Sequence, residues 1–133
     1  EEREAAYAIR MTVFVEEQNI PPWEEIDAED ETAYHLLALV DSLPVGTARI
    51  LSRGGEIGKI GRVAVLAEHR KAGVGRELMI KAIGHCRNVY SRVELDAQVE
   101  VIPFYQGLGF REDGEIFMDC EIPHQHMLLD LSQ

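Results

Sequence analysis

The sequence predicts an α+β fold with a central, mostly antiparallel sheet and flanking helices. Three observations support this fold class. A helical period covers residues 2–14, three strand-like runs follow one another between residues 34 and 65, and a second helical period begins at Val74 after a glycine-rich stretch. A chain of 133 residues can close one core. We therefore expect a single domain that spans residues 1–133.

The first helix is predicted from apolar residues three or four positions apart, at Ala5, Ala6, Ile9 and Val13. The next segment, residues 16–31, reads "EEQNIPPWEEIDAEDE" and has no sustained period. Its Pro-Pro pair disfavours regular structure, so we expect a long loop with at most one short helical turn. Long loops in small domains are often functional.

The middle of the chain predicts three consecutive antiparallel strands. The third contains Gly58 and Gly61, and a glycine inside a strand often marks a bulge or the close approach of a ligand. The expected strands are residues 34–40, 45–51 and 57–65, separated by turn signals at 41–44 and 53–56.

The C-terminal half predicts a helix on a sheet, followed by further strands. An apolar stripe from Val74 to Tyr90 has the spacing of a helix packed against strands. The remaining expected elements are a strand at 93–99, a short helix from Pro103 that ends at a glycine cap at Gly109, and strands at 115–121 and 126–131.

The composition excludes several classes of function. The chain carries 13 Lys and Arg against 24 Asp and Glu, a net charge of −11, which disfavours binding to nucleic acid or to an anionic membrane. No apolar run approaches the roughly 20 residues of a membrane span, and no signal peptide is visible. The two cysteines, Cys86 and Cys120, form no C-x-x-C motif, so we expect a cytoplasmic protein.

The acidic charge is concentrated in one segment. No Lys or Arg occurs from Met11 to Ala48, whereas eight acidic residues lie between Glu16 and Glu31. Two interpretations are open: a solvated acidic loop, or a rim that attracts a cationic substrate.

A phosphate-binding loop is predicted where the third strand is followed by a helix. The first N–H groups of a helix lack intrahelical partners and carry partial positive charge, so they bind anions where the backbone is accessible. Gly73 and Gly75 would give that access, and Arg70, Lys71 and Arg76 would add positive charge. The residues fit neither a Walker loop nor a dinucleotide-binding fingerprint. The bland alternative is a glycine-rich start of a helix.

The chain resembles GNAT-superfamily N-acetyltransferases, and within them the ElaA/YjcF-like branch. The segments that carry the resemblance are "VFVEEQNIPPWEEID", "GTARI", "IGRVAV", "VAVLAEHRKAGVGRELM", "LDAQ", "PFYQGLGF" and "IPHQHM". The resemblance runs from the first helix to the last strand. It implies the GNAT acyl-CoA N-acyltransferase fold with a splayed strand pair. Members usually have a short strand ahead of the first helix, most of which we expect this chain to lack.

The resemblance implies a cosubstrate, acetyl-CoA, and residues that bind it. The backbone of Val63, Ala64 and Val65 would pair with the pantetheine arm, across the splay from residues 95–98. The loop Arg70, Lys71, Ala72, Gly73, Val74, Gly75 and Arg76 would hold the pyrophosphate. Phe104 is a further expected contact of the cosubstrate.

The resemblance also implies a reaction: transfer of acetyl to a primary amine by direct attack through a tetrahedral intermediate. Tyr105 matches the family's tyrosine that protonates the departing thiolate. A backbone N–H near residues 63–65 could stabilise the oxyanion. No base stands out, since Glu17 is a candidate and a water chain would also suffice. Expected acceptor contacts are Gln18, His35, Gln98 and His124, with His126 as a further candidate.

A non-catalytic CoA-binding module of the same fold is the alternative function. Two features motivate it: no base can be assigned, and residues 100–103 lack the asparagine that the family often places there. The pair His124-x-His126 lacks a third ligand, so we expect no metal site. The acceptor would be a small-molecule or peptide amine, and a homodimer is a further expectation from the resemblance.

Overall fold

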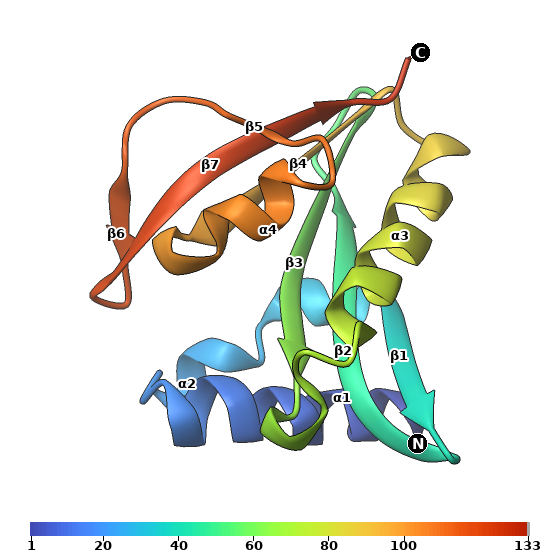
Figure 1. Ribbon diagram of the computed structural model, residues 1–133, viewed down its shortest axis with the longest axis vertical. Helices are drawn as coiled ribbons and strands as arrows, with labels where there is room; N and C mark the ends of the chain where they lie inside the picture. The colour runs from blue at the N-terminus through green and yellow to red at the C-terminus, as the bar shows by residue number, and fades with distance from the viewer. Residues whose placement is uncertain (133) are drawn as a thin grey trace. The chain divides into compact units, whose positions relative to one another are not determined.

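The computed structural model describes residues 1–132 and has both helices and strands (Figure 1). In chain order the helical elements are α1 (Glu2–Arg10), the π-helix η1 (Met11–Glu17), α2 (Pro22–Glu25), the 3₁₀-helices η2 (Ala28–Glu31) and η3 (Ala67–His69), α3 (Val74–Arg87), the 3₁₀-helix η4 (Val99–Val101) and α4 (Ile102–Gln106). The strands are β1 (Tyr34–Val40), β2 (Leu43–Ser52), β3 (Ile57–Val65), β4 (Arg92–Gln98), β5 (Arg111–Glu112), β6 (Phe117–Asp119) and β7 (Ile122–Asp130).

The seven strands are hydrogen-bonded in the order β1-β2-β3-β4-β7-β5, and β6 pairs with β7. β3 and β4 are parallel and pair over three residues each, Ile57–Lys59 with Arg92–Glu94. β1 pairs with β2 in antiparallel fashion, and so does β7 with each of β4, β5 and β6. The predicted α+β class with a mostly antiparallel sheet is therefore confirmed.

The chain divides into two compact units. The first contains Glu1–Leu51 and Ile60–Gly84, and the second contains Ser52–Lys59 and the chain from His85 onward. β3 passes from the second unit into the first at Ile60.

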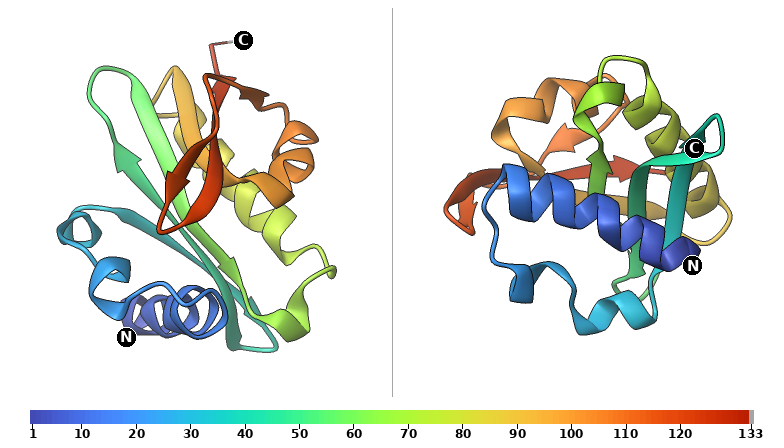
Figure 2. Two further views of the ribbon diagram at one scale, coloured as in Figure 1. Left: turned by 90° about the vertical axis from the view of Figure 1, so that its left-hand side faces the viewer. Right: turned by 90° about the horizontal axis from the view of Figure 1, so that it is seen from below.

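In the first unit, helices cover both faces of the strands, with α1 on one face and α3 on the other (Figure 2). The α1 side is closed by a buried cluster of Ile9, Val13 and Phe14 against Ala64 of β3. The side chains follow the helical spacing that the sequence predicts for residues 2–14. α1 continues without a break into η1, and the change to π-helical hydrogen bonding has no signal in the sequence.

The acidic segment is more ordered than the sequence predicts. Instead of a loop with one helical turn, it holds α2, which begins at Pro22, and η2. Asp27 caps η2 by accepting a hydrogen bond from the N–H of Glu29, and Asp30 accepts one from the N–H of Asp27. A reciprocal cap of this kind explains why a short 3₁₀-helix forms in so polar a sequence.

In the second unit, β7 lies between β4 and the short strands β5 and β6. Val93, Leu95 and Ala97 of β4 are buried, and they alternate with Glu94, Asp96 and Gln98, which are partly exposed. α4 ends in the predicted glycine cap, because Gly109 has a φ of 104° and the N–H of Phe110 donates to the carbonyl of Tyr105.

The last strands differ from the prediction. β7 begins at Ile122 rather than residue 126, β6 is shorter than the expected 115–121, and β5 was not expected. The turn between β6 and β7 has positive φ at both Cys120 and Glu121. Asn-Gly or Asp-Gly is the usual sequence for such a turn, so Cys-Glu gave no signal.

The end of α3 and the role of Gly58 also differ from the predictions. α3 ends at Arg87, so Tyr90 is not part of the helix. A Cβ at Gly58 would lie 2.5 Å from the ring of Tyr90, which shows that this glycine makes room for a side chain of the protein rather than for a ligand. Within residues 1–132, no helix combines the length and the apolar character needed to cross a membrane.

Candidate functional site

The glycine-rich loop runs directly into the N-terminus of α3 (Figure 1). The first α-helical hydrogen bond is donated by the N–H of Glu77 to the carbonyl of Gly73, so the N–H groups of residues 74–76 precede the helical ladder. Lys71 and Gly73 have φ of 69° and 86°, and a Cβ at Gly73 would meet nothing within 4 Å. Residues 70–73 and 76 are exposed. The loop therefore offers accessible N–H groups, a helix N-terminus and three cations, which is the chemistry of an anion site.

Arg70 is held by two contacts within the first unit. Its Nε donates to the carbonyl of Val65 at 2.8 Å, and one terminal nitrogen forms an ion pair with Glu17 at 2.7 Å. Of the predicted site residues in this unit, Glu17 and Arg70 are thus in direct contact. Gln18 follows η1 immediately after Glu17.

The three residues predicted to bind the pantetheine arm are the last three of β3. Ala64 is buried, and Val63 and Val65 are partly exposed. Just before them, Arg62 has a φ of 50°. A left-handed backbone costs a non-glycine residue about 1–2 kcal/mol, and inside a strand it is the mark of a bulge.

A network of buried ion pairs lies beneath the acidic segment. The guanidinium of Arg10, 1% exposed, donates to Glu25 at 2.9 Å and to Asp30 at 2.7 and 3.0 Å. Burial alone would raise the pKa of Asp30, but the hydrogen bonds from Arg10, from the N–H of Asp27 and from Arg49 outweigh it and hold the pKa below its ordinary value.

Arg49 and Arg62 complete the network. Arg49 contacts Asp27 at 2.8 Å and Asp30 at 2.9 Å, and the hydrogen bond from Arg49 is the main cause that lowers the pKa of Asp27. Arg62 contacts Glu25 at 3.0 Å and Asp27 at 3.2 Å. Three guanidinium groups therefore face three closely paired carboxylates, and a fourth, that of Glu29, lies 3.9 Å from Arg49. Glu25 and Asp30 are buried, and the side chain of Asp27 is 35% exposed but paired with two arginines, so none of the three acids is free to attract a cationic substrate.

His35 lies next to the same acids, since it contacts Asp30 of η2. Its Nε2 lies 3.0 Å from the carbonyl of Asp30, and its ring meets the ring of Tyr7 edge-on at 6.1 Å. Among the described residues its buried Nδ1 has no hydrogen-bond partner.

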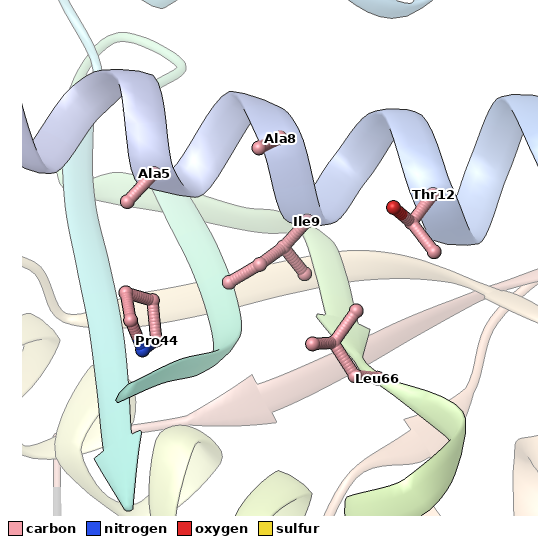
Figure 3. A pocket seen from close by; sticks show the side chains of 6 residues that line it. All are labelled: Ala5, Ala8, Ile9, Thr12, Pro44 and Leu66. Atoms are coloured by element: carbon pink, nitrogen blue, oxygen red, sulfur yellow. The ribbon is translucent and has the colours of Figure 1, made fainter. Parts of the chain in front are cut away.

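A separate pocket of about 340 Å³ lies along α1 (Figure 3). Small side chains of the helix face the start of β2 and the residue that follows β3. The lining residues are Ala5, Ala8, Ile9, Thr12, Pro44 and Leu66. Thr12 supplies the one polar side-chain atom of this set, so the pocket lacks the groups that acid–base chemistry requires.

In the second unit, Tyr105 is 8% exposed and sits between two aromatic rings. Phe104 and Phe110 meet it edge-on, with centroids at 5.0 and 6.1 Å. Burial raises the pKa of Tyr105 to about 12, so the phenol keeps its proton at neutral pH but is a weaker acid than a free phenol. Phe104 is 37% exposed.

The polar face of β4 and β7 carries a further set of titratable groups. Gln98 and His124, both predicted acceptor contacts, are direct cross-strand partners, and the ring of His124 stacks on Phe117 at 5.8 Å. Asp96 contacts Lys59 and His126, each at 2.8 Å. Burial would raise the pKa of Asp96, but these two hydrogen bonds lower it overall.

The described part of the chain has two free cysteines, of which Cys86 is buried and Cys120 is exposed. Across residues 1–132, no three His, Cys, Asp or Glu side chains are arranged to hold a metal ion. Cys86 is buried, and burial raises its pKa to about 11, which makes it a poor nucleophile.

Sequence reasoning missed the arginines of the network and Asp96. One signal was present: the stretch without Lys or Arg, 11–48, is bounded by Arg10 and Arg49. These are the two guanidinium groups that neutralise its buried acids. For Arg62 and Asp96 the sequence carried no comparable signal.

Comparison with known proteins gives one consistent result. The family model of the acetyltransferase (GNAT) domain matches residues 7–131. The uncharacterized N-acetyltransferase YjcF of Bacillus subtilis is 38% identical over 98% of this chain and 94% of its own. The crystal structure of Escherichia coli ElaA is 34% identical with a TM-score of 0.86, covering 96% of this chain and 88% of its own. An acyl-CoA N-acyltransferase from Pseudomonas aeruginosa is 30% identical, also with a TM-score of 0.86, covering 95% and 88%.

Proposed function

Because the chain belongs to the GNAT acetyltransferase family, we propose that it transfers an acetyl group from acetyl-CoA to a primary amine. Proteins of this fold bind CoA-type ligands. Acetyl-CoA would supply the acyl group in activated form, as a thioester. The acceptor would be a small molecule or the amine of a peptide.

The observation that carries the proposal is the fit of residues 70–76 to a pyrophosphate. Gly73 is left-handed and has open space around it, so a ligand can approach the backbone. The N–H groups of residues 74–76 precede the helical ladder and coincide with the positive end of the α3 dipole. The exposed side chains of Lys71 and Arg76 add positive charge in a protein whose net charge is −11.

The end of β3 would bind the pantetheine arm through its backbone. Val63, Ala64 and Val65 lead from the left-handed residue Arg62 to the residues that precede the glycine loop. Backbone N–H groups here would also stabilise negative charge on the thioester oxygen, as in an oxyanion hole.

Tyr105 is the proposed proton donor to the departing thiolate. The phenol carries the proton that the thiolate would take, and two aromatic rings pack edge-on against its ring. The exposed Phe104 next to it is a proposed contact of the cosubstrate.

A further set of residues is proposed to contact the amine and to take its proton. Glu17 as proton acceptor stays a prediction, and the carboxylate would first have to leave its ion pair with Arg70. Gln98 and His124 occupy one polar strand face and are proposed acceptor contacts, as is Gln18. His35 stays a proposed acceptor contact, although its Nε2 lies 3.0 Å from the carbonyl of Asp30 in η2.

The test is an acyl-transfer assay that measures release of CoA thiol from acetyl-CoA in the presence of primary amines. Polyamines, aminoglycosides and lysine peptides form the panel, with their N-acetylated forms as matched controls. Transfer to at least one free amine, absent with its acetylated form, supports the enzyme. Saturable acetyl-CoA binding without transfer to any amine would instead support the non-catalytic CoA-binding module.

A further inference from the structure

Arg62 combines two features that rarely occur together. It is the left-handed residue of β3, and its guanidinium reaches over to the acidic segment. β3 also contains two glycines, Gly58 and Gly61, which could adopt a left-handed backbone without strain, yet neither has a positive φ. The strained conformation therefore falls on the residue with the long side chain.

The side chain of Arg62 makes contacts that can hold this conformation. Its Nε and one terminal nitrogen donate to the carbonyl of Glu25 at 3.2 and 3.1 Å. The terminal nitrogen also lies 3.4 Å from the carbonyl of Glu24 and 3.2 Å from Asp27. Glu24 and Glu25 are the last residues of α2, so the guanidinium caps the C-terminal end of that helix.

Arg62 is not needed to neutralise Glu25 and Asp27. Glu25 has its own partner in Arg10 at 2.9 Å, and Asp27 has its own partner in Arg49 at 2.8 Å. The side chain of Arg62 is 27% exposed, whereas those of Arg10 and Arg49 are 1% and 6% exposed. Loss of Arg62 would leave each carboxylate paired, so the fold should survive its replacement.

We infer that Arg62 is a positioning residue: its guanidinium, bound to the end of α2, holds the left-handed backbone of residue 62 and thereby the backbone of Val63–Val65. One side chain then couples the acidic segment to the strand that precedes the glycine loop. The inference rests on the proposed function in one respect only: it assigns residues 63–65 to acyl-CoA binding.

The experiment compares Arg62→Ala with Arg62→Gly. Both variants lose every contact with α2, but glycine takes the left-handed backbone without strain and alanine does not. Acetyl-CoA affinity is measured by isothermal titration, and hydrogen exchange of the amides of residues 63–65 is measured by NMR. Asp41, which has a φ of 52° in the turn between β1 and β2, supplies the control pair Asp41→Ala and Asp41→Gly.

We expect Arg62→Ala to bind acetyl-CoA at least tenfold more weakly than wild type, a change of about 1.4 kcal/mol. Without the guanidinium, the conformation with a left-handed residue 62 becomes a minor part of the population, and we expect only that conformation to bind acetyl-CoA well. Arg62→Gly should stay within about threefold of wild type, and its amides at 63–65 should exchange more slowly than those of the alanine variant. The control pair should not change the affinity.

Equal affinity and equal exchange in the two Arg62 variants would overturn the inference, since a role in stability alone would affect both alike. If wild type binds no acetyl-CoA, the proposed function fails instead. The exchange rates then decide the inference by themselves: a difference between the alanine and glycine variants supports it, and equality overturns it.

Discussion

Replacing Arg10 with methionine tests whether buried ion pairs fasten the acidic segment. Arg10 is 1% exposed and makes four hydrogen bonds to residues of this segment, at 2.7 to 3.0 Å. Removing one partner of a buried pair costs about 3–5 kcal/mol, because the remaining charge stays buried. Glu25 keeps Arg62 and Asp30 keeps Arg49, so we expect the lower end, about 3 kcal/mol.

The free energy of unfolding is measured by urea denaturation followed by circular dichroism. In thermal unfolding, a loss of about 3 kcal/mol should lower the midpoint temperature by roughly 10–15 °C. Arg3→Met is the matched control, because Arg3 lies exposed on the same helix. If the Arg10 variant unfolds within about 0.5 kcal/mol of the control, the buried network contributes no net stability and the reasoning fails.

Three further predictions concern pH, catalysis and packing. The lowered pKa of Asp30 contributes stability that is fully present above pH 3.8, the ordinary pKa of the group, and is lost as the pH falls below that value. In urea titrations, the free energy of unfolding of wild type should therefore fall more steeply below pH 4 than that of Asp30→Asn. Tyr105→Phe should lower kcat about 100-fold in the thiol-release assay and leave acetyl-CoA affinity unchanged; a kcat within threefold of wild type would exclude the proton-donor role. Gly58→Ala should destabilise by about 1–3 kcal/mol in thermal unfolding, because the new Cβ would overlap the ring of Tyr90; unchanged stability would mean that the ring moves freely.

Local signals in the sequence were enough to predict β1, β3 and the start of α3. The bounds of β1 and β3 match the predicted residues 34–40 and 57–65, because turn residues on either side interrupt long apolar runs. The start of α3 at Val74 follows from the same reasoning, since a left-handed glycine precedes it.

Features that depend on distant residues could not be predicted. Whether an acid such as Asp30 is buried depends on Arg10 and Arg49, which lie 20 and 19 positions away in the chain. The contact of Arg62 with Asp27 joins residues 35 positions apart. No periodicity encodes such pairs, and composition alone left open both a solvated loop and a rim that attracts a cationic substrate.

The resemblance to a family pointed to Tyr105, and the pattern of glycines and cations pointed to the glycine loop. The burial and the contacts of these groups became known only from the structure. Burial of the phenol, which raises its pKa, depends on how α4 packs. Likewise, the ion pair of Glu17 with Arg70 joins residues 53 positions apart and was not foreseen for either residue.

The central claim, that residues 70–76 bind the pyrophosphate of acetyl-CoA, is tested most directly by isothermal titration of wild type, Gly73→Asn and Gly73→Asp. Asparagine and aspartate have the same size and both tolerate a left-handed backbone, so the two variants differ mainly in charge. A carboxylate about 4 Å from a phosphate charge costs up to about 4 kcal/mol near a protein surface.

Gly54, left-handed with open space and remote in sequence from the loop, supplies the control pair Gly54→Asn and Gly54→Asp. We expect wild type to bind acetyl-CoA saturably with micromolar affinity. Gly73→Asn should lose a modest part of this affinity, Gly73→Asp at least a further tenfold, and the two Gly54 variants should not differ. Equal affinity of the two Gly73 variants would contradict pyrophosphate binding by residues 70–76, and so would the absence of binding by wild type.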